Sequence, residues 1–133
     1  MDLYTILHEA HSGIRWLILL LSVITIIKLL MTWLQKGEFG KGDQMLTRIF
    51  VSTIDIQFLL GLSMVLWFAI NTELARYQIE HAVTNLVAIG LIHFAAKWKR
   101  SPGPIRARNT LIVYVIGFLL MGLAISRLPQ GWN

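Results

Sequence analysis

Histidine, arginine and carboxylate side chains interrupt segments of this chain that are otherwise apolar. The stretch 8–16, HEAHSGIRW, holds two histidines, a glutamate and an arginine directly before an apolar run. His81 stands at a matching depth in a second apolar segment, residues 77–96. Two imidazoles on facing helices are the usual axial ligands of haem iron in membrane b-type cytochromes. His11 and His81 are therefore the candidate ligands of one haem b.

Three neighbours of the histidine pair fit the same interpretation. Arg15 lies four residues after His11 and so on the same helix face, where an arginine can meet a haem propionate. Asn85 lies one turn after His81 on the same face. Gly13, beside His11, is expected to leave room for a flat macrocycle. These positions predict a haem site near one membrane surface.

A plainer interpretation treats the same side chains as polar groups of the membrane interface. A long arginine side chain there can reach the lipid headgroups. Glu80 fits either account, since it could orient a histidine or lie in the interface. His8 and His11 could also bind a metal ion with Glu80 or His81, although no complete ligand set is evident. The interface is the simpler account of any single residue, and the two histidines at matched depth favour haem.

A second group of polar residues lies deeper, towards the opposite surface: Lys28, Asp55, Gln57 and His93. A lone carboxylate in the hydrocarbon region costs about 2.5 to 3.5 kcal/mol on insertion scales, so Asp55 needs a partner. We expect a structural ion pair between Lys28 and Asp55, with Gln57 nearby. Alternatively, Asp55 and His93 share a proton path or a quinone-binding pocket. His93 lies about 18 Å along the helix from His81, so the two cannot serve one iron.

The elements that position these residues are predicted from hydropathy. Hydrophobic residues make up 56% of the chain and charged residues 14%, whereas soluble domains carry about 25% charge. The excess falls in four segments long enough to cross a bilayer. We therefore predict an all-α membrane protein of one domain, residues 1–133, with spans at about 11–34, 49–70, 77–96 and 110–126. Pro102 and Pro104 end the third span, and Asn109 or Thr110 is the expected N-cap of the fourth.

Basic residues set the expected orientation. Nine of the twelve lysines and arginines flank the first and third loops, and only Arg15, Arg76 and Arg127 belong to the other side. The positive-inside rule places those loops in the cytoplasm and both termini outside. We predict an up-down four-helix bundle in the bacterial inner membrane with periplasmic termini. Tryptophans fit the two interfaces: Trp33 and Trp98 on the inner side; Trp16, Trp67 and Trp132 on the outer side.

Composition also excludes several classes of function. The chain has no cysteine, which removes disulfides, iron–sulfur clusters, thiolate zinc sites and covalently attached c-type haem. The net charge of +5 is explained by topology, so we expect no nucleic-acid partner. The sequence carries neither a Ser-His-Asp set nor a phosphate loop. An electron carrier or an accessory subunit is therefore expected rather than an enzyme.

Three motifs resemble a family of short four-helix membrane proteins, described as cytochrome b in Bacteroidetes and relatives. The first is His-Ser-x-x-Arg-Trp at residues 11–16, and the second is Asp-x-Gln with a following Leu-Leu-Gly at 55–61. The third is Glu-His at 80–81 with a second histidine at position 93. The resemblance covers the first three spans by motif and the fourth by hydrophobicity alone. It implies His11 and His81 as haem ligands.

These observations lead to three functional hypotheses. The first is a small b-type cytochrome that carries electrons between a quinol pool and a partner. The second is a haem-free accessory subunit of a larger respiratory or photosynthetic membrane complex. The third is a proton or ion conductor that uses Lys28, Asp55 and His93. All three place the chain in a lipid bilayer, and the first two expect other membrane subunits as partners.

Overall fold

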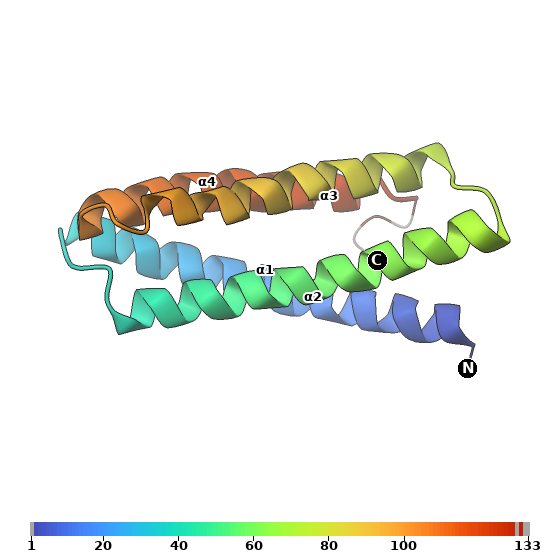
Figure 1. The fold of residues 1–133 in the computed structure, drawn as a ribbon, viewed down its shortest axis with the longest axis horizontal. Helices are drawn as coiled ribbons and strands as arrows, with labels where there is room; N and C mark the ends of the chain where they lie inside the picture. The colour runs from blue at the N-terminus through green and yellow to red at the C-terminus, as the bar shows by residue number, and fades with distance from the viewer. Residues whose placement is uncertain (1, 130, 132–133) are drawn as a thin grey trace.

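The computed structural model describes residues 2–129 and 131, and these residues form an all-helical bundle without strands. The helices are α1 (Leu3–Leu34), α2 (Lys41–Asn71), α3 (Arg76–Phe94) and α4 (Gly103–Ser126), and a short 3-10 helix, η1 (Ala95–Trp98), extends α3. The four long helices run alternately up and down, and each is long and apolar enough to cross a membrane (Figure 1). The predicted four-helix membrane bundle is confirmed. Trp132 lies outside the described residues.

Three helices begin about two turns earlier than the sequence predicts: α1 at Leu3, α2 at Lys41 and α4 at Gly103. Asp2 caps α1, because its carboxylate accepts a hydrogen bond of 2.8 Å from the backbone N–H of Thr5. Hydrogen bonds from Thr5 also hold the pKa of Asp2 below its usual value. His11 therefore lies more than two turns inside α1. The predicted N-cap of α4 at Asn109 or Thr110 is wrong, since α4 begins at Gly103, directly after Pro102.

Packing between the helices is uneven around the bundle. α1 packs along both α2 and α4, and α3 packs along α4, whereas α2 and α3 touch over only a short stretch. Among the described residues, α1 and α3 have no backbone contact, so they lie diagonally opposite each other (Figure 1). Long side chains on α1 and α3 can therefore meet across the core. The side of the bundle between α2 and α3 is its most loosely packed side.

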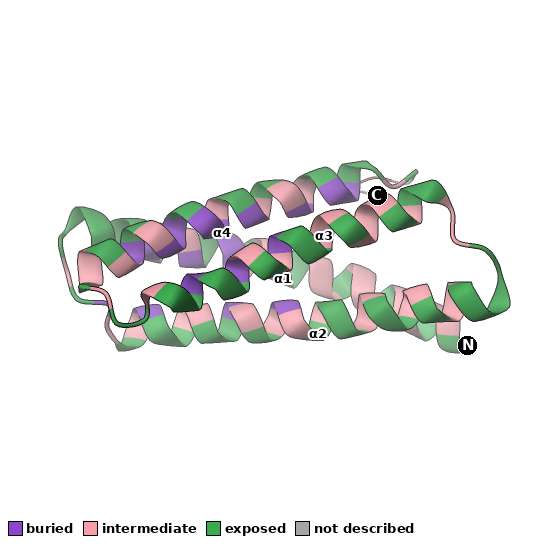
Figure 2. Ribbon diagram, turned by 45° about the horizontal axis from the view of Figure 1, so that its top comes forward, coloured by how far each residue is buried: buried purple, intermediate pink, exposed green. Residues whose placement is uncertain are grey.

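α4 is the most buried of the four helices. Figure 2 shows buried residues along the sides of α4 that face its neighbours. At Gly117 a Cβ atom would lie 3.0 Å from Ile92 of α3, so a glycine is needed for this close approach. Phe50 of α2 packs on Tyr114 of α4 with ring centres 5.1 Å apart. α4 thus contributes most of the core.

Large apolar side chains cover the outside of the bundle. Leu59 of α2 and Leu119 of α4, for example, are 60% and 63% exposed, far from either helix end. In water such a surface would be strongly unfavourable, and in a bilayer the acyl chains cover it. The outer surface is therefore consistent with contact with lipid on several sides.

Candidate functional site

His11 and His81 meet inside the bundle. They project from the diagonal helices α1 and α3, and their ring centres are 6.3 Å apart with an angle of 73° between the planes. Imidazoles that bind one metal ion from opposite sides have ring centres about 6 Å apart, because each metal–nitrogen bond is about 2 Å. Each ring can rotate about its own metal bond, so the angle is unconstrained. The separation would allow the two imidazoles to hold one haem iron between them.

The surroundings of His81 fix the protonation of its ring. Its Nδ1 lies 2.9 Å from the carbonyl oxygen of Ala124 on α4. A carbonyl can only accept, so Nδ1 carries the proton and Nε2 keeps its lone pair. The amide of Asn85 lies 3.3 Å from that Nε2 and also donates to the backbone carbonyl of His81 at 3.0 Å. A backbone carbonyl on the second ring nitrogen is typical of a histidine that binds a metal.

His11 is held from the opposite direction by α2. A Cβ atom at Gly61 would lie 3.2 Å from Cε1 of His11 and 3.7 Å from its Nδ1, so the absence of a side chain makes room for the imidazole. Gln57, one turn earlier on α2, donates from Nε2 to the backbone carbonyl of His11 at 2.8 Å. The glycine that serves His11 is therefore Gly61. A Cβ atom at Gly13 would meet nothing within 4 Å, so the expected role of Gly13 stays a prediction.

Several buried polar atoms around His11 lack a hydrogen-bond partner. Among the described residues, four buried side-chain nitrogen or oxygen atoms are unpartnered, and three of them belong to His11 (Nδ1), Arg15 (Nε) and Gln57 (Oε1). The guanidinium of Arg15 also lies 4.9 Å from the ring centre of Trp16. An unpartnered buried polar group costs about 1 to 3 kcal/mol, so hydrogen bonds from a polar ligand would stabilise these three atoms.

The expected ion pair between Lys28 and Asp55 is wrong. Lys28 instead lies 3.2 Å from Asp43, near the start of α2. Gln57 is also misplaced in the prediction, since it contacts His11 and not the deeper group. α2 begins at Lys41, earlier than predicted, so Asp43 lies at a depth that Lys28 can reach and Asp55 lies about 18 Å further along the helix.

Asp43 is the residue that the sequence prediction missed. It is 1% exposed, and its carboxylate accepts from Thr32 Oγ1 at 2.7 Å, from Lys28 Nζ at 3.2 Å and from the backbone N–H of Gly40 at 3.1 Å. The signal was its place in the first turn of a helix, where a carboxylate can accept from a free backbone N–H. This cluster is fully hydrogen-bonded, which fits a structural role.

Asp55 and His93 pair with each other across the loosely packed side. His93 Nε2 lies 2.7 Å from Asp55 Oδ1, and the two side chains are 48% and 50% exposed. The proposed proton conductor used Lys28 together with Asp55 and His93. Lys28 is not part of this pair, because it contacts Asp43 instead. A carboxylate that contacts an imidazole can pass a proton, and this pair faces outwards between α2 and α3.

Glu80 lies outside the histidine pair. It forms ion pairs with Arg76 at 3.1 Å and with Arg127 at 3.8 Å. It therefore does not orient His81, whose Nδ1 is held by α4. His8 lies one turn before His11, with its ring centre 5.9 Å from that of Tyr4. The described residues contain no group of three or more histidine, aspartate or glutamate side chains that could hold a metal ion.

Comparison with known proteins adds no homologue to this description. No protein-family model, curated protein or solved structure matches the chain. The functional argument therefore depends on the geometry of the polar clusters themselves.

Proposed function

We propose that this chain binds one b-type haem between α1 and α3 and takes part in electron transfer within a membrane. The observation that carries the proposal is the partly buried histidine pair, whose ring centres are 6.3 Å apart, with unpartnered polar atoms of His11, Arg15 and Gln57. Haem would supply a reversible one-electron couple at this place. The motif resemblance to small cytochrome b-like proteins supports the same assignment.

The chain's own residues would have distinct roles in such a site. His11 and His81 would bind the iron, and the carbonyl of Ala124 would keep His81 in the tautomer with Nε2 free. Arg15 would supply positive charge for a propionate, which explains its buried and unpartnered Nε. Asn85 would leave the His81 ring nitrogen and keep its bond to the backbone.

The test is an absorption spectrum of the purified protein, oxidised and reduced, with four histidine variants. His11→Ala and His81→Ala should each lose the b-type signal, because each removes one axial ligand. His8→Ala and His93→Ala are matched controls and should keep it. A folded native protein without any haem signal, or a signal unchanged in His11→Ala, would contradict the proposal. The first of these outcomes favours a haem-free accessory subunit of a larger membrane complex.

We also propose that Asp55 and His93 bind the headgroup of a quinone. The supporting observation is that this hydrogen-bonded pair is half exposed on the side where α2 and α3 are least packed. A quinone moves within the bilayer and can reach this side, and its oxygens can hydrogen-bond to a carboxylate–imidazole pair. In equilibrium binding of a short-chain quinone, Asp55→Asn and His93→Leu should weaken binding, while Glu80→Gln should not. Equal binding by all variants would contradict the assignment.

The distribution of basic residues supports an orientation for the molecule. The end of the bundle with the α1–α2 and α3–α4 connections carries nine of the twelve basic residues. We propose that this end faces the cytoplasm of a bacterial inner membrane, so that the termini and the histidine pair lie on the periplasmic side. Labelling of single introduced cysteines at positions 38 and 73 from outside the cell would test it. Only position 73 should react.

A further inference from the structure

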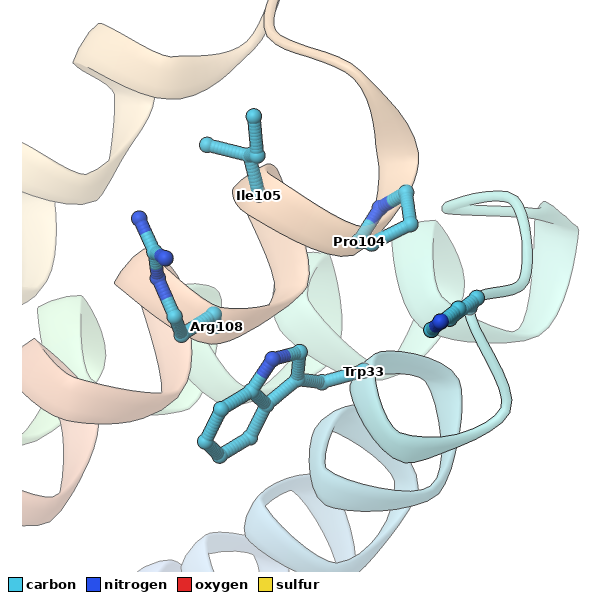
Figure 3. A pocket seen from close by; sticks show the side chains of 5 residues that line it. Trp33, Pro104, Ile105 and Arg108 are labelled. Atoms are coloured by element: carbon cyan, nitrogen blue, oxygen red, sulfur yellow. The ribbon is translucent and has the colours of Figure 1, made fainter.

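A shallow pocket lies at the basic end of the bundle, far from the histidine pair. It has a volume of about 270 Å³ and is lined by Trp33, Lys36, Pro104, Ile105 and Arg108. Figure 3 shows the indole of Trp33 projecting from the end of α1 towards the first turns of α4, where Arg108 lies beside it. The pocket therefore combines two cations with an aromatic and an apolar wall, at the end of the bundle where α1 ends and α4 begins.

The cations of this pocket lack acidic partners. Within residues 2–129 and 131, the side chain of Lys36 has neither a hydrogen bond nor an ion pair, and the only side-chain hydrogen bond of Arg108 is from Nε to Asn109 Oδ1, at 3.1 Å. The buried carboxylate at this end, Asp43, is already occupied by Lys28 and Thr32. Two unneutralised cations that face one pocket attract an anion.

Lys36 also has a backbone conformation that disfavours lysine. Its φ of 52° is in the left-handed region, and it is the only described residue other than glycine with a positive φ. The bonds from Lys36 N to Trp33 O and from Gly37 N to Thr32 O form a Schellman motif at the end of α1. Glycine is the usual residue at this position, because it has no Cβ to strain. Here the glycine comes one residue later, at Gly37. A strained residue that carries a pocket cation suggests a function for its side chain.

We propose that this pocket binds the phosphate headgroup of an anionic phospholipid, with Lys36 and Arg108 contacting the phosphate and Trp33 at the glycerol level. The volume is below the roughly 300 to 1,000 Å³ of pockets that enclose drug-sized ligands, so it suits a headgroup whose acyl chains remain in the bilayer. Tryptophan prefers the level of the membrane interface, and basic pockets between helices recognise anionic headgroups. The proposal is independent of haem binding.

The test measures lipid affinity of the full-length protein in mild detergent by native mass spectrometry with added phosphatidylglycerol. Lys36→Gln and Arg108→Gln should each lower the affinity about fivefold, as expected for removal of one cation near a membrane surface. Lys99→Gln and Arg100→Gln remove the same charge from the same end outside the pocket, and they should change it less than twofold. Equal losses in all four variants would show diffuse surface attraction and overturn the site.

A second variant at Lys36 separates charge from backbone strain. Lys36→Gly should lower lipid affinity as much as Lys36→Gln, and it should also raise the Tm of the protein by about 3 °C, because glycine relaxes the left-handed residue. A gain in Tm with unchanged lipid affinity would overturn the role of the lysine. Inorganic phosphate is added in a parallel arm at constant ionic strength. Displacement of the lipid by millimolar phosphate would assign the pocket to a soluble phosphate and overturn the lipid as its occupant.

Discussion

Two polar clusters inside this bundle differ in how completely their hydrogen bonds are satisfied. Both oxygens of Asp43 accept hydrogen bonds, and its donors are Thr32, Lys28 and the backbone of Gly40. Around His11, by contrast, three buried polar atoms on three side chains lack partners. Buried polar groups in native proteins are nearly always paired. The Asp43 cluster is thus explained by stability alone, whereas the unpartnered atoms around His11 support our proposal that this cluster binds a ligand.

Of the changes that distinguish the two clusters, a substitution of Asp43 is expected to have the largest effect on stability. Asp43→Ala removes the acceptor of three donors and leaves the Lys28 ammonium partly buried without a counter-charge. We expect a loss of about 3 kcal/mol or more in the free energy of unfolding, measured by denaturant unfolding in mild detergent. Glu38→Ala, at an exposed position in the connection between α1 and α2, is the control and should change the free energy of unfolding little. A loss below about 1 kcal/mol at Asp43 would mean that the cluster is not structural.

A smaller effect is expected where α2 leaves room for His11. Gly61→Ala places a Cβ atom 3.2 Å from Cε1 of His11, so the ring must move by a few tenths of an ångström. We expect haem affinity to fall about tenfold, a change of about 1.4 kcal/mol, measured by titration of haem into the haem-free protein. Gly90→Ala is a matched control, because a Cβ there meets nothing within 4 Å. Equal affinities of the two variants would place haem elsewhere.

In the haem-free protein, replacing His11 and replacing His81 should change the stability in opposite directions. His11→Leu removes an unpartnered buried nitrogen, and we expect the haem-free protein to gain about 1 kcal/mol of stability. His81→Leu removes the bond to Ala124 and should lose a similar amount. Chemical unfolding of haem-free samples measures both. Destabilisation by His11→Leu would indicate that its ring already has a partner.

The smallest effect is expected at the outer surface. Glu80 pairs with Arg76 and Arg127, but the Arg76 and Arg127 side chains are largely exposed. Exposed ion pairs contribute between 0 and about 1 kcal/mol, so Glu80→Gln should change stability by about 0.5 kcal/mol or less and leave haem affinity unchanged. A loss of haem affinity in Glu80→Gln would show that Glu80 contributes to the histidine site.

The sequence predicts the helices well because hydropathy, loop composition and helix length all carry local signals. Segments 49–70 and 77–96 fall within α2 and the combined α3 and η1. The ends are harder to predict, since capping depends on single residues. Asp2 caps α1 well before the apolar run begins. Pro102 and Pro104, which the sequence predicts to end the third span, lie at the start of α4.

The partners of polar residues are harder to predict because they depend on helix rotation and on which helices are neighbours. His11 and His81 could be matched by depth, and the diagonal packing of α1 and α3 brings them together. The same argument by depth failed for Lys28, because α2 begins at Lys41 and not near residue 49, which puts Asp55 about three turns beyond the carboxylate that Lys28 reaches, Asp43. Gly61 could not be assigned to His11 from one sequence, because the contact joins two different helices.

The most direct test of the difference between the two clusters is thermal unfolding with and without added haem. The native protein, His11→Leu, His81→Leu and the control His93→Leu are compared in mild detergent. A ligand present at a hundred times its Kd stabilises the folded state by about 2.7 kcal/mol, so the Tm of the native protein and the control should rise by several degrees. Neither His11→Leu nor His81→Leu should show this rise. An equal rise in all four proteins, or none in the native protein, would contradict the assignment of the histidine pair as a ligand site.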